Sequence, residues 1–361
     1  QSGHGTVTIG SIEKYLTDKA WENGWVKPIK VKIENEQSVG IIGAGPAGLA
    51  CGEELRKKGY QVTIYDRYDR AGGLLIYGIP NFKLEKHVVE RRIKLLKDGG
   101  INFVNNFEVG KDSTLKELQS KHDAILISTG VYKPREVNLP GNDLSNIFPA
   151  MEFLTASNKK GLGDKVEMFD NGTLNAEGKD VVVIGGGDTA MDCVRTSIRQ
   201  NAKSVKCIYR RDKENMPGSA KEVNHAIEEG VEFIFNAQPR RLLGNGSIKQ
   251  LEIIKTKLGD IDETGRKKPI VIDGSEQIID IDKLVIAFGY TSSPQSFMEK
   301  QKINLEEDGL VSLTNHKYNY QTSNPKYFAG GDMVIGSSLA VHAIAHGRDA
   351  AKEILSYIKN N

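Results

Sequence analysis

Cysteine is scarce in this chain. Its 361 residues include only three cysteines, Cys51, Cys193 and Cys207, and no Cys-x-x-Cys pair. An odd number without close spacing excludes a disulfide framework, a zinc ribbon and a redox-active dithiol. An iron–sulfur cluster needs about four closely spaced thiolates, which this sequence cannot supply. The three cysteines fall inside predicted elements, so we expect small buried hydrophobes in a protein of the reducing cytoplasm.

An excess of charge is also lacking. Lys and Arg number 49 against 47 Asp and Glu, a net charge of +2, which gives no electrostatic footprint for nucleic acid or an anionic membrane. No apolar run approaches the roughly 20 residues that span a bilayer. Residues 1–10 are polar and rich in glycine, so no signal peptide is visible, although Gln1 is not an initiator methionine. We therefore expect a cytoplasmic protein with no nucleic-acid or membrane partner.

Glycine, by contrast, is abundant and clustered. The length predicts about two domains at roughly 150 residues each. Two of the glycine clusters follow short apolar runs that are typical of buried parallel strands, and each is followed by a helical pattern and a second β-branched strand. Strand, glycine turn, helix and strand form the βαβ unit, so the sequence predicts an α/β fold with two Rossmann-like dinucleotide-binding domains. The two units comprise 38–42, 46–58 and 61–65, and 181–184, 189–200 and 204–209.

Other segments have clear local patterns. The hydrophobic pattern predicts helices over residues 12–25 and 338–358. It predicts strands that end in glycine over 124–130 and 284–289. The segment 242–281 has the alternation and turn residues of antiparallel hairpins, with turns at 244–246 and 262–265.

The first glycine motif has the form Gly43-x-Gly45-x-x-Gly48. The first glycine permits a tight turn, the second lets a pyrophosphate approach the backbone, and the third lets helix and strand pack closely. Asp66 ends the next strand, 18 residues after Gly48, where an acid hydrogen-bonds a ribose hydroxyl. Because strand, helix and acid are all in place, a turn that serves packing alone is the weaker interpretation.

The second motif has the form Gly185-x-Gly187-x-x-Ala190, but its strand ends in Arg210 and Arg211 instead of an acid. An acid would repel a 2′-phosphate, whereas an arginine pair can clamp one with charge-assisted hydrogen bonds. This half should therefore prefer NADP(H) to NAD(H). The alternative, a merely solvated pair of arginines, is weaker because the acid is also absent.

The C-terminal part of the sequence indicates which dinucleotide each of the two glycine motifs binds. Asp332 follows a glycine pair, and the helix predicted from Ser338 would turn its positive end toward the flavin N1/O2 region. We therefore expect FAD at the first site and NADPH at the second. The predicted FAD-binding residues are Gly43, Ala44, Gly45, Pro46, Ala47, Gly48, Asp66, Arg67, Gly72, Gly73, Leu74, Thr129, Gly130, Gly331, Asp332, Ser338, Leu339 and Ala340. The predicted NADPH-binding residues are Gly185, Gly186, Gly187, Asp188, Thr189, Ala190, Arg210, Arg211, Ala287, Phe288 and Gly289.

These motifs resemble the two-dinucleotide-binding flavoproteins, and within them the small (beta) subunits of NADPH-dependent glutamate synthase. The Gly-Gly-Leu-Leu-Ile-Tyr-Gly-Ile-Pro run at 72–80 is the most specific part of the resemblance. The resemblance extends from about Gly5 to near the C-terminus. The other segments that carry it are 5–13, 43–48, 129–130, 134–135, 139–141, 185–192, 209–212, 216–218 and 329–332.

The resemblance implies an NADPH-dependent flavoprotein oxidoreductase with its NADPH domain inserted into a discontinuous FAD domain. The implied boundaries are 1–28 for an extension, 29–149 and 289–361 for the FAD domain, and 150–288 for the NADPH domain. Hydride would pass from nicotinamide to flavin N5. Electrons would then leave through iron–sulfur clusters to a large subunit, which makes glutamate from glutamine and 2-oxoglutarate.

One departure keeps alternatives open. Family members carry a cysteine-rich iron–sulfur domain before the segment that matches 6–25, and this sequence has none of it. The same half-reaction serves ferredoxin-type and pyrimidine-reductase-type acceptors in related proteins. A non-catalytic binding subunit is a further alternative, against which the intact glycines argue.

No metal and no protein acid or base is expected. His342 and His346 have a metal-ligand spacing but lack the glutamate of a zincin, so packing or a flavin contact is the better interpretation. Glu222 is either near the nicotinamide or an exposed helix residue. Hydride transfer itself needs only stacking geometry, exclusion of water and tuning of the flavin.

Overall fold

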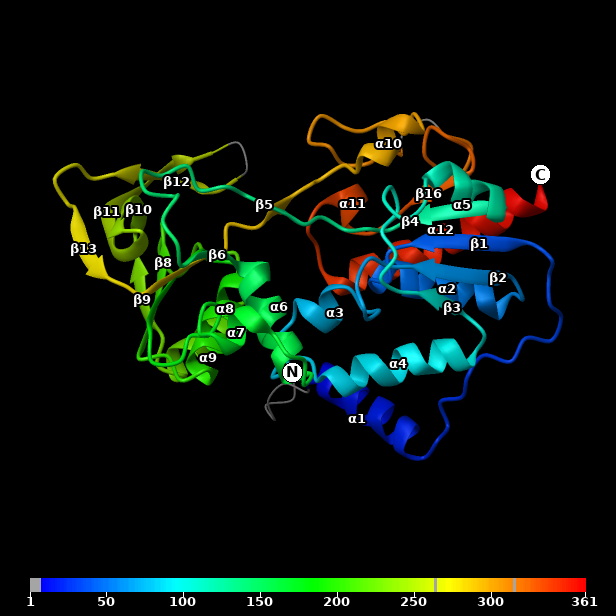
Figure 1. The fold of residues 1–361 in the computed structure, drawn as a ribbon, viewed down its shortest axis with the longest axis horizontal. Coiled ribbons are helices and arrows are strands. Elements are labelled where there is room, and N and C mark those ends of the chain that lie inside the picture. The colour runs from blue at the N-terminus through cyan, green and yellow to red at the C-terminus, as the bar shows by residue number, and fades with distance from the viewer. Residues whose placement is uncertain (1–7, 263–264, 314–315) are drawn as a thin grey trace, which may run out of the picture.

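A computed structural model describes residues 8–262, 265–313 and 316–361. Two lobes lie side by side, with the N- and C-terminal parts of the chain in one and the middle part in the other (Figure 1). Residues 5–7 of the resemblance and residues 263–264 of a predicted turn lie outside the described residues.

The first lobe is built on a five-stranded sheet in which every pair is parallel. The strand at 124–127 consists of buried apolar residues, and residues 39–42 of the neighbouring strand are buried, as expected of parallel strands that are covered on both faces. Helices α2 (Pro46–Lys57) and α12 (Ala340–Lys359) pack so closely that a Cβ on Gly347 would lie 2.1 Å from the Ala47 carbonyl oxygen. The sheet order is β16 (Tyr327–Ala329), β4 (Ala124–Ile127), β1 (Ser38–Ile42), β2 (Gln61–Tyr65) and β3 (Asn102–Val104).

Further helices connect the strands of this lobe or lie beside its sheet (Figure 1). They are α3 (Leu74–Tyr77), α4 (Lys86–Asp98), α5 (Leu115–Lys121), α10 (Ser296–Lys300) and α11 (Asp332–Ile335).

The second lobe repeats the plan with a second five-stranded parallel sheet. Its helices are α6 (Ala150–Gly161), α7 (Glu167–Asp170), α8 (Asp188–Arg199) and α9 (Ala220–Glu228). The order of its strands is β6 (Ile147–Pro149), β14 (Lys283–Ile286), β7 (Asp180–Ile184), β8 (Ser204–Tyr209) and β9 (Glu232–Phe235).

The chain crosses between the lobes twice, and the crossings pair with each other. β5 (Lys133–Pro134) leaves the first lobe and is antiparallel to β15 (Tyr290–Thr291), which returns to it. The first sheet is therefore discontinuous in sequence, since β16 comes from beyond the second lobe. The predicted α/β class with two Rossmann-like domains is confirmed. Because β6 pairs with β14, the second sheet already includes residues 147–149.

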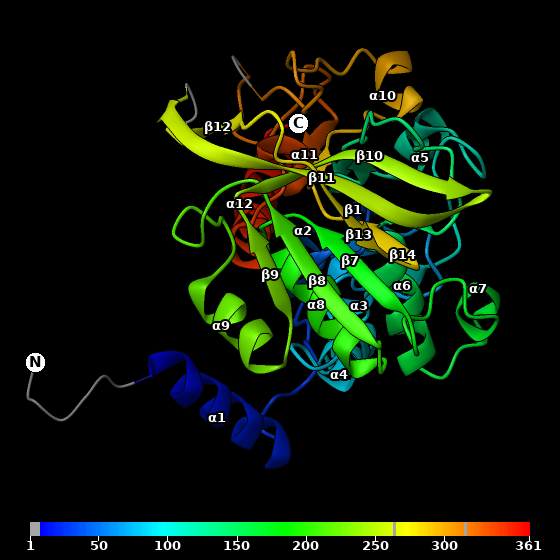
Figure 2. The ribbon, with the colours of Figure 1, turned by 90° about the vertical axis from the view of Figure 1, so that its left-hand side faces the viewer.

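An antiparallel arm covers the outer end of the second lobe (Figure 2). Its longest strand, β11 (Ser247–Ile261), pairs with three others. This matches the hairpin pattern predicted for 242–281. The other strands of the arm are β10 (Ala237–Asn245), β12 (Lys267–Val271) and β13 (Gln277–Asp280).

The N-terminal helix α1 (Ile9–Glu22) lies against α4, and none of its described residues is buried. Arg91 pairs with Asp18 at 2.7 Å and lies over the Trp21 ring at 4.8 Å. The predicted helix over 12–25 thus forms, but it begins and ends about three residues earlier. Among the described residues, no helix is long and apolar enough to cross a membrane.

Candidate cofactor-binding site

In the first glycine turn, two glycines lie against neighbouring backbone atoms and the third faces open space. Gly43 has φ +103°, and a Cβ there would lie 2.4 Å from the Ser128 carbonyl oxygen. A Cβ on Gly48 would lie 2.0 Å from the Gly43 oxygen. Gly45 precedes α2, has ordinary φ −77°, and a Cβ there would meet nothing within 4 Å. The free space beside Gly45 is therefore available to a ligand that approaches the helix N-terminus.

The second turn has the same geometry. A Cβ on Gly185 would lie 2.4 Å from the Ala287 carbonyl oxygen, and Gly187, which precedes α8, again has open space. Ala190 takes the third place and is fully buried. The chain thus presents two equivalent cradles, each with backbone N–H groups at a helix N-terminus, that fit the pyrophosphates of two dinucleotides.

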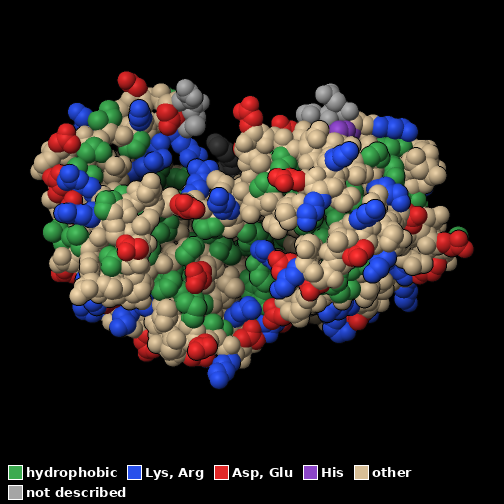
Figure 3. Space-filling view, turned by 45° about the horizontal axis from the view of Figure 1, so that its top comes forward, with side chains coloured by type: hydrophobic (Ala, Val, Ile, Leu, Met, Phe, Trp, Pro, Cys, Tyr) green, Lys and Arg blue, Asp and Glu red, His purple; other side chains and the backbone are tan. Residues whose placement is uncertain are grey.

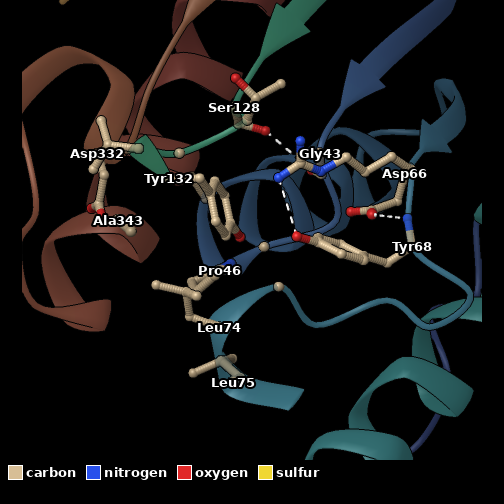
Figure 4. A pocket seen from close by; sticks show the side chains of 18 of the residues that line it. Gly43, Pro46, Asp66, Tyr68, Leu74, Leu75, Ser128, Tyr132, Asp332 and Ala343 are labelled. Atoms are coloured by element: carbon tan, nitrogen blue, oxygen red, sulfur yellow. Dashed lines mark hydrogen bonds between the residues drawn. The ribbon is translucent and has the colours of Figure 1, made fainter. Parts of the chain in front are cut away.

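One cavity of about 680 Å³ begins at the first cradle and reaches the start of α8. Asp188 and Thr189 of the second cradle line it together with the first-site residues. Figure 4 shows Asp66 and Tyr68 on one side of the glycine turn and Asp332 and Ala343 on the other. All the predicted FAD residues line the cavity except Ala44, Gly48 and Gly72, which lie behind it.

The carboxylate of Asp66 closes the first turn. It accepts a hydrogen bond from the Ala44 N–H at 2.6 Å. It accepts a second one from the Tyr68 N–H at 2.8 Å (Figure 4). Burial raises the pKa of Asp66, and these two N–H groups oppose the rise. Since each carboxylate oxygen accepts more than one hydrogen bond, Asp66 can still receive a ribose hydroxyl from the cavity.

Asp332 lines the opposite side of the cavity, beside the N-terminus of α12. Burial raises its pKa to about 6, opposed by a hydrogen bond from the Ser338 N–H. Ser338, Leu339 and Ala340 line the same wall, so the positive end of the 20-residue α12 faces the cavity. This is the arrangement expected to stabilise negative charge that develops on a flavin.

Asp332→Asn is expected to stabilise the cofactor-free chain at pH 7 while weakening flavin binding. The folded-state pKa of about 6 exceeds the ordinary 3.8, so the wild-type free energy of unfolding falls as pH rises through this interval. Asparagine removes that dependence. Thermal unfolding of the cofactor-free chain at pH 4 and pH 7 measures it. A lower melting temperature for the variant at pH 7 would contradict the burial of a destabilised carboxylate.

The arginines of the second site are not equivalent. Arg210 is exposed, and its guanidinium has no ion-pair partner among the described side chains. Arg211 is 3% exposed, and its Nε donates to the Lys267 carbonyl oxygen at 2.5 Å. The predicted arginine pair is thus corrected to a single available guanidinium, because the second one is committed to the arm. Lys and Arg side chains gather where the surface is hollowed between the lobes (Figure 3).

The remaining predicted NADPH residues surround the second turn. A Cβ on Gly186 would lie 2.4 Å from the Tyr209 ring, and Asp188 accepts from the Ser219 N–H at 2.9 Å. Ala287 is buried behind the turn, while Phe288 is 39% exposed and Gly289 has φ +84°. Phe288 and Gly289 thus lie at the crossing between lobes.

Sequence patterns missed an ionic group that joins the lobes inside the cavity. Lys83 of the first lobe lies 2.8 Å from Asp192 and 3.5 Å from Glu222 of the second. Glu222 also pairs with Arg195 at 2.6 Å, so the exposed-helix alternative is wrong. Arg70 and Asp164 form a second bridge, bidentate at 2.7 Å for both bonds.

Aromatic residues of the cavity were also missed. Tyr132, just after the predicted Gly130, lines the cavity beside the first cradle, and the Arg67 guanidinium lies 4.9 Å from both the Tyr132 and Tyr68 ring centres. Phe107, Val109 and Phe297 add apolar side chains to the lining of the cavity.

The histidines and cysteines behave as structural groups. His342 shares a hydrogen bond with Ser338, and His346 packs edge-on against Tyr320. Within the described ranges, no group of three or more His, Cys, Asp or Glu could hold a metal ion. Cys51, Cys193 and Cys207 are buried and unpaired, and burial raises the pKa of each thiol.

Known proteins share this sequence and geometry. The pyridine nucleotide-disulphide oxidoreductase family matches residues 37–347. The glutamate synthase (NADPH) small chain of Azospirillum brasilense is 55% identical over 361 residues, 99% of this chain and 74% of that protein. The chain belongs to the glutamate synthase small-chain group of this oxidoreductase family. A putative glutamate synthase (NADPH) small chain of Cereibacter sphaeroides is 51% identical over 99% of this chain and 86% of that protein.

Membership of the glutamate synthase small-chain group confirms the predicted family and makes the chain an oxidoreductase that works with a pyridine nucleotide. FprA from Mycobacterium tuberculosis, in complex with NADPH, superposes with a TM-score of 0.75 over 90% of this chain and 85% of that one. At 16% identity this likeness shows the shared fold.

Proposed function

We propose that the chain is the FAD-containing, NADPH-oxidising module of a glutamate synthase. FAD and NADPH are the cofactors that its family membership supports. The observation that carries the proposal is that two equivalent glycine cradles meet at one cavity, with the first-site residues and the start of α8 in the same lining. Two dinucleotides bound there would place their reactive ends together.

The residues of the cavity act by binding and positioning. The N–H groups of the Gly43–Gly48 turn and of the Gly185–Ala190 turn hold the two pyrophosphates. Asp66 and Asp332 line the cavity, where Asp66 would hold the FAD ribose and Asp332 with the N-terminus of α12 would hold the flavin. FAD supplies the acceptor for two electrons and a proton from NADPH. The protein orients the rings and excludes water, and no side chain is required as an acid or base.

The proposal also concerns the protein that accepts electrons from the flavin. A small chain of this kind works with a large subunit, and we place iron–sulfur clusters and the conversion of glutamine and 2-oxoglutarate to glutamate beyond the flavin. The reaction takes place in the cytoplasm, in keeping with three buried, unpaired thiols. The same half-reaction with a ferredoxin-type or pyrimidine-reducing acceptor is the second candidate.

The visible spectrum of the purified chain tests the core of this proposal. We expect a flavin band that bleaches under anaerobic NADPH much faster than under NADH. A band that NADPH leaves unchanged would overturn the second-site assignment. A chain that stays colourless after FAD is added would favour a non-catalytic subunit. Mixing the reduced chain with a glutamate synthase large subunit or with ferredoxin then separates the two acceptors.

Arg210→Ala is expected to raise the KM for NADPH by roughly 10- to 100-fold, the value of a charge-assisted bond to phosphate, and to change the KM for NADH little. Its guanidinium is exposed and free of an ion pair among the described residues, so it is available for the 2′-phosphate. Steady-state reduction of an artificial acceptor measures both constants. Equal changes for the two nucleotides would remove Arg210 from cofactor selection.

A further inference from the structure

The loop that carries Arg210 is attached to the antiparallel arm. The Thr256 hydroxyl, on β11, donates to the Arg210 carbonyl oxygen at 2.9 Å. The Asn236 N–H, just before β10, donates to the Arg211 carbonyl oxygen at 3.0 Å. Arg211 Nε in turn donates to the carbonyl oxygen of Lys267, the first residue of β12, at 2.5 Å. Two of these bonds therefore fix the backbone of the loop to the arm, and the third attaches the Arg211 side chain to it.

The two side chains that take part in these bonds are buried, whereas the side chain of Arg210 is exposed. Thr256 and Arg211 are each 3% exposed, and Arg211 Nη2 lies 3.5 Å from Asp262. Burying a guanidinium and a hydroxyl is unfavourable unless their hydrogen bonds are made, so these side chains favour one conformation of the loop. The Thr256 N–H also donates to the Asn236 oxygen at 2.7 Å, which ties the two attachment points together.

We propose that Thr256 and Arg211 are positioning residues for nucleotide selection, which hold Arg210 at the second cradle so that it meets the 2′-phosphate of NADPH. The proposal deepens the proposed function and rests on its assignment of NADPH to the second cradle. It gives the arm a role: selectivity between NADPH and NADH depends on residues that do not touch the nucleotide. Arg211 serves through its bond to Lys267 and not as a second phosphate ligand.

The test measures binding to the full chain by calorimetry, with 2′,5′-ADP as the probe that carries the 2′-phosphate and 5′-AMP as the probe that lacks it. Thr256→Val removes the hydroxyl at nearly constant volume. We expect Thr256→Val to lower the affinity for 2′,5′-ADP by about tenfold and the affinity for 5′-AMP by less than about twofold. Thr256→Ser keeps the hydroxyl and is the matched control, with binding of both probes near the wild-type value.

A double-mutant cycle shows whether Thr256 acts through Arg210. In an Arg210→Ala chain, adding Thr256→Val should leave 2′,5′-ADP binding unchanged within about twofold, because the group being positioned is gone. The same tenfold loss in both backgrounds would overturn the proposal. If Arg210→Ala alone leaves 2′,5′-ADP binding intact, the proposed second-site assignment fails. If only Thr256→Val is without effect, the positioning role fails and the assignment stands.

Arg211 is tested in the same way with Arg211→Lys, which keeps the charge but not the Nε donor to Lys267. A positioning role predicts a loss of 2′,5′-ADP affinity that is largely absent in the Arg210→Ala background. A loss that adds fully to that of Arg210→Ala would make Arg211 a direct phosphate ligand and overturn its positioning role. Should this variant fail to fold, as circular dichroism would show, the Thr256 cycle still decides the proposal.

Discussion

Gly45→Ala is expected to lower the affinity for FAD by roughly 10- to 100-fold without destabilising the cofactor-free chain. The backbone of Gly45, with φ −77° and ψ −177°, suits alanine, and the new Cβ would meet no protein atom within 4 Å. The methyl group would instead occupy the space reserved for a pyrophosphate. Equilibrium titration of the cofactor-free chain with FAD, followed by flavin fluorescence, measures the loss.

Gly187→Ala is the matched control in the second cradle. It also has an ordinary backbone, with φ −90° and ψ 176°, and open space. We expect this variant to bind FAD normally but to be reduced by NADPH at least tenfold more slowly at limiting NADPH. A Gly45→Ala chain that keeps full FAD affinity would show that the first turn serves packing alone. Loss of FAD from Gly187→Ala would show that the two cradles are not separate sites.

Lys83→Met is expected to lower the free energy of unfolding by about 3 kcal/mol at pH 7, because it leaves the buried carboxylate of Asp192 without its cation, while Glu222 keeps Arg195. Asp192 is 8% exposed, and its pKa is raised by burial more than Lys83 lowers it. Without Lys83 the pKa of Asp192 should rise further. The deficit should therefore shrink as pH falls and Asp192 takes up a proton. Urea unfolding at pH 7 and pH 5 measures both effects.

Lys94→Met provides the control for Lys83→Met, because Lys94 pairs with Asp98 at 2.7 Å on the surface and its side chain is 74% exposed. Its removal should change stability by less than about 0.5 kcal/mol at either pH. A double variant, Lys83→Met with Asp192→Leu, should recover part of the loss. Equal effects of Lys83→Met and Lys94→Met would mean that the bridge between the lobes does not stabilise the fold.

Much of the fold could be predicted because its signals are local. Short β-branched runs next to glycine turns marked β1, β2 and β8 at the bounds the structure has. The pairing of strands that are distant in the sequence could not be predicted. β16 pairs with β4, and β6 with β14, although each pair is separated by more than a hundred residues and neither β6 nor β16 is longer than three. Such short strands carry no periodicity, and tertiary packing alone selects their neighbours.

The candidate site also contains residues that the sequence predicted and residues that it did not. Glycine turns and their following acids or arginines are spaced by the βαβ unit, so Gly43, Gly185 and Asp66 were predictable. Lys83 and Asp192 meet only because the lobes pack together. Arg211 is buried because its side chain donates to the carbonyl oxygen of Lys267, 56 residues later. Every residue has such a carbonyl oxygen, so no sequence pattern could have indicated this bond. Tyr132 had no pattern that would have singled it out.

The discontinuous first sheet has a consequence for synthesis of the chain. β4 ends at Ile127, and the strand that covers its outer edge begins at Tyr327, 200 positions later. At roughly 5 to 20 residues per second, a ribosome takes on the order of 10 to 40 seconds to deliver that strand. Until then β4 presents an unpaired edge of Ala, Ile and Leu residues, the kind of surface that pairs with other chains. The middle lobe is complete before that strand is made, so the first sheet can close only after the second lobe has been synthesised.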